Sequence, residues 1–279
     1  MKLKEFYRQT VRTLQESGIE NARFESRQLL TGLFSLKETD LLSDRIEITP
    51  QQQATVENCC RKRCNGYPLQ YLLGEWEFYG LPFDVGEGVL IPRQDTETLC
   101  EWVLQSCSKH QPERIIDLCS GSGCIAVTLA KYLTKSRVFA LEKSEKAAEY
   151  CRRNIEKNRV PVTLLQDDAI SPSTLETGFD LIVSNPPYIS SKDREKLQKE
   201  LSYEPEEALF AEEEGLFFYR KLTEVWKERL KPGGGLIYEV GIHQHQAVCD
   251  ILEGHGFESV GTQKDLCGID RIVFGKRPD

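Results

Sequence analysis

The feature that most constrains the fold is a repeated order of apolar segment, turn and helix that starts at residue 114. Apolar segments stand at 114–118, 137–141, 162–165, 179–183 and 236–240. Helical spacing of apolar residues follows them at 124–133, 144–157, 216–230 and 243–254. Repeated βα units of this kind build a mostly parallel sheet with helices on both faces.

Two further strands are predicted near 257–262 and 270–274, with no helix between them. Strands joined without a crossover helix pair antiparallel. We therefore expect an α/β fold with a seven-stranded, mostly parallel sheet whose last strand is antiparallel.

The amino-terminal part has a different character. Phe6, Thr10 and Leu14 share one face of a first predicted helix, and Thr49-Pro50 is typical of a helix start. Residues 75–85 alternate polar and apolar around Gly80, which predicts a β-hairpin. The expected domains are a helical domain at 1–72, a β-hairpin linker at 73–89 and the α/β domain at 90–279.

Charge and composition exclude several classes of protein. The 279 residues include 44 acidic and 36 basic ones, which gives a net charge of −8. A dedicated duplex-DNA binder needs a basic face, so we expect no sequence-specific contact with nucleic acid. The first ten residues lack a signal-peptide core, and no apolar run approaches membrane-spanning length. We expect a cytoplasmic protein with no membrane contact.

The ten cysteines are expected to be reduced rather than to form disulfides. Cys59, Cys60 and Cys64 lie together, but they contain no Cys-x-x-Cys pair and there is no second cluster. We predict no metal site.

A glycine-rich turn follows the first strand of the α/β region. Residues 115–123 have the sequence Ile-Ile-Asp-Leu-Cys-Ser-Gly-Ser-Gly. Glycines at the carboxyl end of a parallel strand let the backbone approach a ligand closely. Glu142 ends the second strand, 19 residues after the last glycine, where a carboxylate can accept hydrogen bonds from both hydroxyls of a ribose.

This arrangement suits either a nicotinamide dinucleotide or S-adenosylmethionine. Asp117, inside the strand before the turn, favours the second, because an acidic neighbourhood suits a sulfonium cation better than a pyrophosphate. The acidic pair at the end of the third strand, which includes Asp168, is placed to contact the edge of an adenine ring.

The sharpest motif is Asn185-Pro186-Pro187-Tyr188, directly after the fourth strand. The two prolines fix φ and remove two backbone donors, so carbonyl acceptors remain. The amide oxygen of Asn185 adds a further acceptor, and Tyr188 adds a flat face. Two acceptors and a planar wall suit a planar –NH₂ group, and holding both of its hydrogens directs the nitrogen lone pair at an electrophile.

These features resemble the class I S-adenosylmethionine-dependent amino-methyltransferases. Other segments narrow the resemblance to the HemK/PrmC family of release factor glutamine-N5 methyltransferases, over essentially the whole chain. Those segments are Tyr67–Gly74 (Tyr-Pro-Leu-Gln-Tyr-Leu-Leu-Gly), Phe78-Tyr79-Gly80, Leu90–Glu97 (Leu-Ile-Pro-Arg-Gln-Asp-Thr-Glu) and Tyr203-Glu204-Pro205.

The resemblance implies a Rossmann-like catalytic domain, a helical substrate-recognition domain and S-adenosylmethionine as cofactor. The implied partner is a class I peptide chain release factor, methylated on the glutamine of its Gly-Gly-Gln loop. The implied cofactor-binding residues are Cys119, Ser120, Gly121, Ser122, Gly123, Glu142, Asp168, Ala169 and Asn185. The implied catalytic residues are Asn185, Pro186 and Tyr188, and Pro187, Arg93 and Glu97 complete the substrate-binding set.

The chain departs from the family pattern at three cofactor-binding positions. One is Glu142, which stands where aspartate is common and whose longer side chain is expected to shift the ribose slightly. Cys119 stands where glycine is usual, so it needs an ordinary φ or must tolerate strain. Ala169 stands where some relatives have an aromatic residue that stacks on adenine.

Three other functions stay open from the residues alone. A nucleic-acid amino-methyltransferase shares the chemistry but needs an electropositive channel, and Arg61-Lys62-Arg63 is the one compact basic patch. A nicotinamide dehydrogenase needs a hydride-handling residue, and the four histidines fall in predicted surface segments. A non-catalytic binding module would share the cofactor site without turnover.

Overall fold

The computed structural model describes residues 1–174 and 176–279, which form two compact units. The first unit consists of Met1–Glu75 together with Gln198–Tyr203. The second consists of Trp76–Leu197 and Glu204–Asp279. In these described residues no helix is both long and apolar enough to cross a membrane.

The first unit is helical. Its helices are α1 (Leu3–Glu16), α2 (Ala22–Phe34), η1 (Glu38–Leu42), α3 (Pro50–Cys64), α4 (Leu69–Leu73) and the short η3 (Lys199–Tyr203). Helix α3 begins with a capping box, in which the Gln52 N–H donates to Thr49 Oγ1 at 3.2 Å and the Thr49 N–H donates to Gln52 Oε1 at 3.0 Å. The segment 198–203 belongs to this unit through an ion pair of Glu200 with Arg63 at 2.9 Å.

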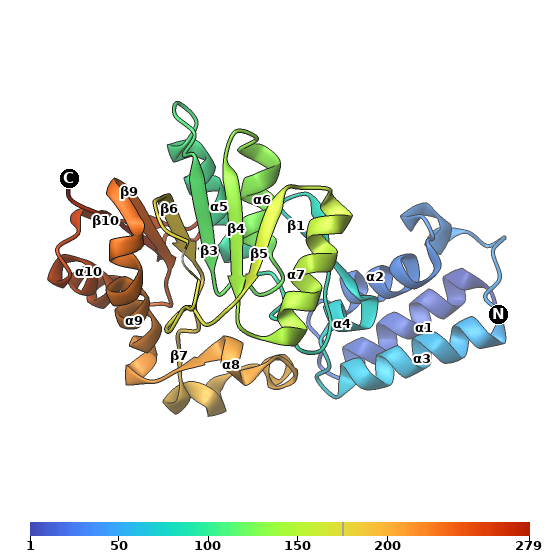
Figure 1. Ribbon diagram of the computed structural model, residues 1–279. Coiled ribbons are helices and arrows are strands. Elements are labelled where there is room, and N and C mark those ends of the chain that lie inside the picture. Colours follow the sequence, from blue (N-terminus) through green and yellow to red (C-terminus); the bar gives the residue numbers. More distant parts are fainter. Residues whose placement is uncertain (175) are drawn as a thin grey trace. The chain divides into compact units, whose positions relative to one another are not determined.

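The second unit contains a seven-stranded sheet in the order β10-β11-β9-β6-β3-β4-β5 (Figure 1). Only β11 runs antiparallel to the other six strands. The strands are β3 (Arg114–Leu118), β4 (Arg137–Glu142), β5 (Val162–Gln166), β6 (Phe179–Ser184), β9 (Leu230–Glu239), β10 (Glu258–Lys264) and β11 (Asp270–Lys276). The expected fold class is confirmed.

Helices cover both faces of this sheet (Figure 1). The main ones are α5 (Gln94–Ser106), α6 (Cys124–Tyr132), α7 (Glu145–Asn158), α9 (Phe217–Trp226) and α10 (His245–Gly254). Short elements connect them: η2 (Ser191–Lys196), α8 (Glu206–Leu209), η4 (Glu213–Gly215), η5 (Lys227–Arg229), the paired strands β7 (Ile189–Ser190) and β8 (Phe210–Ala211), and the hairpin β1 (Glu75–Phe78) and β2 (Leu81–Asp84).

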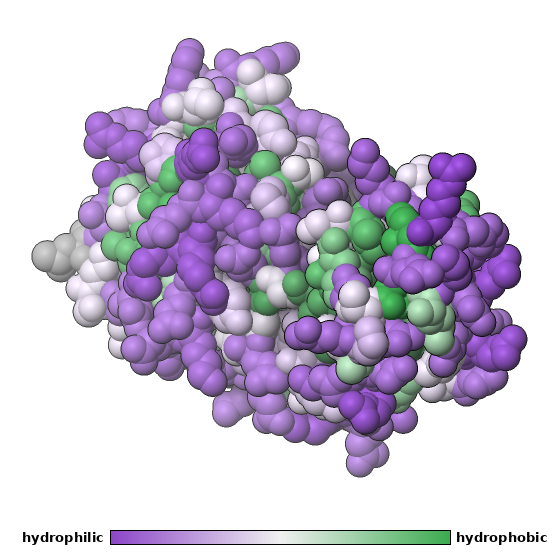
Figure 2. Space-filling view, turned by 90° about the vertical axis from the view of Figure 1, so that its right-hand side faces the viewer, coloured by the Kyte–Doolittle hydropathy of each residue, from purple (hydrophilic) through white to green (hydrophobic). Residues whose placement is uncertain are grey.

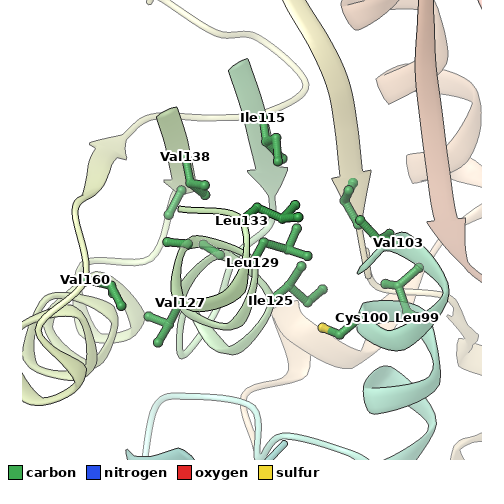
Figure 3. Packing of buried hydrophobic residues seen from close by; sticks show 14 of the residues in the cluster. Leu99, Cys100, Val103, Ile115, Ile125, Val127, Leu129, Leu133, Val138 and Val160 are labelled. Carbon is green, nitrogen blue, oxygen red and sulfur yellow. The ribbon is translucent and has the colours of Figure 1, made fainter. Parts of the chain in front are cut away.

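Alternate residues of β3 and β4 point into two separate hydrophobic cores. Ile115 and Val138 pack with α5, α6 and α7 on one face (Figure 3). Their neighbours Ile116 and Phe139 pack with α9 and α10 on the other face. A strand that is buried on both sides reads as a continuous apolar run, which is why the sequence marks these strands clearly.

The boundary between α9 and β9 differs clearly from the prediction. The helix predicted at 216–230 ends at Trp226, and β9 already begins at Leu230. Pro232–Gly235, the turn residues expected from the sequence to end that helix, lie inside β9, where the pairing with β6 shifts register between Leu230 and Gly235. Gly233 has φ of +70°, which only glycine adopts readily, so the glycines form an irregularity in the strand instead of a loop before it.

The surface agrees with the polar composition. Figure 2 shows a face that is largely hydrophilic, with smaller groups of apolar side chains between the polar ones. Scattered apolar residues are normal on a protein surface and carry no functional conclusion by themselves.

Candidate active site

A large open cavity lies at the carboxyl ends of the parallel strands of the second unit. Its empty volume is about 1130 Å³, and it is lined by residues that follow β3, β4, β5 and β6. In open α/β sheets ligands bind at this edge. Ten of the predicted site residues line it: Arg93, Cys119, Ser120, Gly121, Ser122, Glu142, Asp168, Ala169, Asn185 and Pro187.

The glycine turn is held in a left-handed backbone conformation. Cys119, Gly121 and Gly123 have φ of 58°, 56° and 81°. Cys119 therefore adopts the strained alternative rather than an ordinary φ. A Cβ on Gly123 would lie 2.7 Å from the Cys151 Sγ, whereas a Cβ on Gly121 would meet no atom within 4 Å. Gly123 is thus required for packing, and Gly121 leaves open space next to the cavity.

Asp117 supports this turn from below. Its carboxylate is fully buried and accepts the Ser120 hydroxyl at 2.5 Å and the Ala126 N–H at 3.2 Å. Burial raises the pKa of Asp117 to about 7, against the lowering effect of these two hydrogen bonds. The sequence placed Asp117 correctly beneath the turn, and its contacts show that it orients Ser120.

Glu142 also contacts the turn. One carboxylate oxygen accepts the Gly121 N–H at 2.7 Å, and the other accepts the Ser144 N–H at 2.7 Å. Burial raises the pKa of Glu142, while these two backbone hydrogen bonds lower it. Each carboxylate oxygen has a second lone pair, so the group can still accept a hydrogen bond from a ligand in the cavity.

Asp168 and Ala169 form another wall. Asp168 pairs with Lys143 at 2.8 Å, a contact at the exposed rim that raises the pKa of Lys143. The carbonyl of Ala169 accepts the Trp226 indole N–H at 2.7 Å. That bond fixes the backbone after β5, where the adenine contact is predicted.

Asn185 is oriented by a residue 89 positions earlier in the chain. Its Nδ2 donates to the Thr96 Oγ1 at 3.1 Å. Because the amide nitrogen is engaged there, Oδ1 is the end of the carboxamide that remains for another partner. Asn185 and Pro187 line the same cavity as Gly121 and Glu142, so the diproline corner opens toward the glycine turn.

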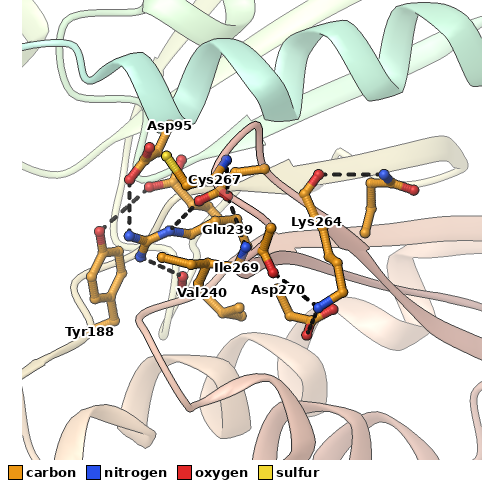
Figure 4. Close-up of polar contacts among 12 residues, drawn as sticks. Asp95, Tyr188, Glu239, Val240, Lys264, Cys267, Ile269 and Asp270 are labelled. Atoms are coloured by element: carbon orange, nitrogen blue, oxygen red, sulfur yellow. Dashed lines mark hydrogen bonds and ion pairs between the residues drawn. The ribbon is translucent and has the colours of Figure 1, made fainter.

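Four predicted site residues do not line the cavity: Glu97, Gly123, Pro186 and Tyr188. Glu97 accepts the Tyr79 N–H at 2.7 Å, so the structure places it under the β1–β2 hairpin. Pro186 is buried, and the Tyr188 hydroxyl donates to Glu239 at 3.5 Å instead of facing the cavity (Figure 4).

Three polar residues at or next to the site were not singled out individually from the sequence. Thr96 lines the cavity and holds Asn185. Glu204 is buried, accepts the Ile91 N–H at 3.0 Å and pairs with Arg93, which ties the cavity-lining segment 205–208 to the loop before α5. Glu239 ends β9. Glu239 could have been predicted from the same pattern as Glu142, because each is a charged residue at the end of an apolar strand.

Two family models match this chain, one in the helical unit and one in the α/β unit. Residues 5–74 match the family model "PrmC N-terminal domain", and residues 95–219 match "Methyltransferase small domain". The chain is 40% identical to a release factor glutamine methyltransferase of Geobacter sulfurreducens, over 94% of this chain and 92% of the relative. It is 38% identical to one of Thermodesulfovibrio yellowstonii, over 90% and 91% of the two chains.

Solved structures share the fold at low sequence identity. A methyltransferase from Pyrococcus furiosus superposes with a TM-score of 0.54 and 18% identity, covering 83% of this chain and all of that one. The hMettl16 catalytic domain, solved with an RNA hairpin, superposes with a TM-score of 0.58 and 17% identity, covering 85% and 86%. These similarities establish the methyltransferase fold of the chain.

Proposed function

The chain belongs to the release factor glutamine methyltransferase family, and we propose that it transfers a methyl group from S-adenosylmethionine to N5 of the Gly-Gly-Gln glutamine of class I peptide chain release factors. The observation that carries the proposal is the orientation of Asn185. Its amide nitrogen is held by Thr96, so its oxygen is available to a substrate in the cavity that Gly121 and Glu142 also line.

The cavity fits this cofactor. A Cβ at Gly121 would meet no atom within 4 Å, so the glycine turn leaves open space there beside the cavity. Glu142 offers lone pairs for ribose hydroxyls beside that space. Glu142 and Asp168 line the cavity, and the Asp117 carboxyl is buried beneath the glycine turn, so the neighbourhood is acidic, which suits a sulfonium cation and disfavours a pyrophosphate. We therefore assign Cys119–Gly123, Glu142, Asp168 and Ala169 to the cofactor.

The substrate carboxamide would be held by oxygen acceptors. When bound, S-adenosylmethionine supplies an electrophilic methyl carbon attached to a sulfonium sulfur. Asn185 Oδ1 accepts one N–H hydrogen of the substrate amide, and a carbonyl of the diproline corner accepts the other. Fixing both hydrogens withdraws the lone pair from the amide π system and aims it across the cavity. These residues act by positioning and electrostatics, because a neutral carboxamide is no effective base, and the nitrogen loses its extra proton to water.

The remaining predicted residues have supporting roles in this proposal. Pro186 and Tyr188 hold the shape of the corner from behind, and Arg93 lines the cavity beside it. We assign recognition of the release factor to the helical domain at 1–72. Because release factors act on the ribosome, the enzyme would work in the cytoplasm.

Methyl transfer to a purified release factor tests the proposal directly. The enzyme is incubated with isotope-labelled S-adenosylmethionine and either the release factor, the same factor with its Gly-Gly-Gln glutamine replaced by glutamate, or DNA. We expect one labelled methyl on that glutamine, located by mass spectrometry, and none in the other two reactions. A methyl on DNA, or on another residue of the release factor, would overturn the proposal.

A further inference from the structure

Asn154 is a buried carboxamide on α7 that the proposed chemistry does not use. It is 0% exposed and does not line the cavity. Burying a polar side chain costs free energy unless its donors and acceptors are paired, so the partners of this carboxamide show what it contributes.

The carboxamide of Asn154 joins two segments that are far apart in the chain. Its Oδ1 accepts the Asp84 N–H at 2.6 Å, and its Nδ2 donates to the Asp84 carbonyl at 3.1 Å and to the Ser122 carbonyl at 2.9 Å. A backbone N–H only donates and a carbonyl only accepts, so these partners fix which end of the carboxamide is the nitrogen. Asp84 ends β2, whereas Ser122 belongs to the glycine turn.

The segment that follows Asp84 packs along the same helix. Val85 and Val89 form a small hydrophobic core with Ala147 of α7. A Cβ on Gly86 would overlap the Tyr150 hydroxyl, so a glycine is required for this close approach. The hydrogen bonds of Asn154 therefore fix the start of a segment that α7 also holds further along.

Both segments joined by Asn154 are walls of the cavity. Residues 88–91 line it after β2, and residues 119–122 line it at the glycine turn. Because one Nδ2 group donates to a carbonyl at each segment, the distance between the two walls depends on this single side chain.

We propose that Asn154 is a positioning residue for the cofactor: by bonding Asp84 and Ser122 together, it fixes the spacing between the wall at 88–91 and the glycine turn, and so preorganises the site for S-adenosylmethionine. This inference rests on the proposed function, in which S-adenosylmethionine occupies this cavity. A site that is already in its binding shape does not lose affinity to the ordering of its walls.

Asn158 provides a matched control on the same helix. It lies one turn further along α7 and is 6% exposed. Its Nδ2 donates to the Pro82 carbonyl at 2.9 Å and to the Asn154 carbonyl at 3.0 Å. Asn158 thus holds β2 to α7 as Asn154 does, but neither of these bonds reaches the glycine turn.

Cofactor affinity separates the two asparagines. We expect Asn154→Ala to raise Kd for S-adenosylmethionine about tenfold or more in calorimetry, and Asn158→Ala to leave it within about threefold of wild type. With cofactor and release factor saturating, kcat of Asn154→Ala should stay within about threefold of wild type, because the groups that hold the reacting amide are untouched. Equal Kd values in the two variants, or a collapse of kcat at saturation, would overturn the inference.

A second substitution covers the case in which alanine at this position prevents folding. Asn154→Leu keeps most of the side-chain volume and removes the same three hydrogen bonds. We expect the same rise of Kd in this variant, and a wild-type Kd would overturn the inference.

Hydrogen exchange without ligand distinguishes failure of this inference from failure of the proposed function. The N–H groups of Ser120, Gly121 and Gly123 are hydrogen-bonded at 3.0, 2.7 and 2.8 Å, so they report on opening of the turn. Measured by mass spectrometry, their exchange should be faster in Asn154→Ala than in Asn158→Ala. Equal exchange in the two variants would overturn the inference. If exchange differs as expected but the wild type binds no S-adenosylmethionine, the positioning role holds and the assigned cofactor is wrong.

Discussion

Replacing Glu142 with alanine should affect both folding and cofactor binding. The carboxylate accepts N–H groups of Gly121 and Ser144, both at 2.7 Å, so the variant leaves two donors unpaired. A hydrogen bond to a charged group contributes about 1.5 kcal/mol or more, which gives about 3 kcal/mol for the pair. Burial raises the pKa of Glu142, so removing the charge also relieves a desolvation cost. We expect a net loss of about 2 kcal/mol, or about 4–8 °C in the unfolding midpoint.

The same variant should weaken cofactor binding more than turnover. Losing ribose hydrogen bonds to a carboxylate predicts a Kd for S-adenosylmethionine that is about 10- to 100-fold higher, with kcat at saturating cofactor within about tenfold of wild type. Calorimetry gives Kd, and thermal unfolding without ligand gives stability. Glu149→Ala, an exposed position of α7, is the matched control and should change neither quantity. An unchanged Kd, or a midpoint within about 1 °C of wild type, would refute the two roles assigned to Glu142.

Substitutions at three further positions test the surroundings of the cavity. Cys119 has φ of 58°, so in urea unfolding the free energy of unfolding of Cys119→Gly should remain within about 1 kcal/mol of wild type. The β-branched variant Cys119→Val should lose about 2 kcal/mol of that free energy. Equal losses in the two variants would contradict the left-handed conformation of this residue. The pKa of Asp117 is raised to about 7, so the contribution of this carboxyl to stability is complete below about pH 4 and is lost as pH rises through 7. Between pH 4 and pH 7, Asp117→Asn should reduce the fall of the unfolding free energy with pH by about 1 kcal/mol per pH unit. Parallel curves of unfolding free energy against pH for wild type and variant would disprove the pKa shift. Glu204→Ala leaves Arg93 and the Ile91 N–H without their acceptor, so the free energy of unfolding should fall by about 2 kcal/mol in urea unfolding. An unchanged free energy would show that these contacts of Glu204 do not stabilise the fold.

Sequence patterns predicted the parts of the fold that depend on local spacing. The buried strands of the α/β region appear as apolar runs, and Glu142 and Asn185 stand at strand ends where the parallel sheet brings them to one edge. The resemblance to the HemK/PrmC family is confirmed by relatives that match over most of the chain. Residues 232–235 were misassigned because glycines inside a strand and glycines before it look alike in sequence.

Contacts between segments far apart in the chain could not be predicted from the sequence. Asn185 and Thr96 are 89 residues apart, and Ile91 and Glu204 are 113 apart, so no periodicity links either pair. Tyr188 was expected to face the substrate, but its hydroxyl donates to Glu239 at the end of β9. Side-chain direction after a turn depends on packing against β9, which spacing alone does not describe.

Single-turnover methyl transfer by Asn185→Ala, at saturating S-adenosylmethionine and release factor, tests most directly whether oxygen acceptors position the substrate amide. The variant removes the Oδ1 acceptor, so we predict a rate about 100- to 1000-fold below wild type, comparable to the loss of one oxyanion-hole donor, with Kd for the cofactor changed by less than the rate. A rate within about threefold of wild type would show that Asn185 does not hold the reacting amide.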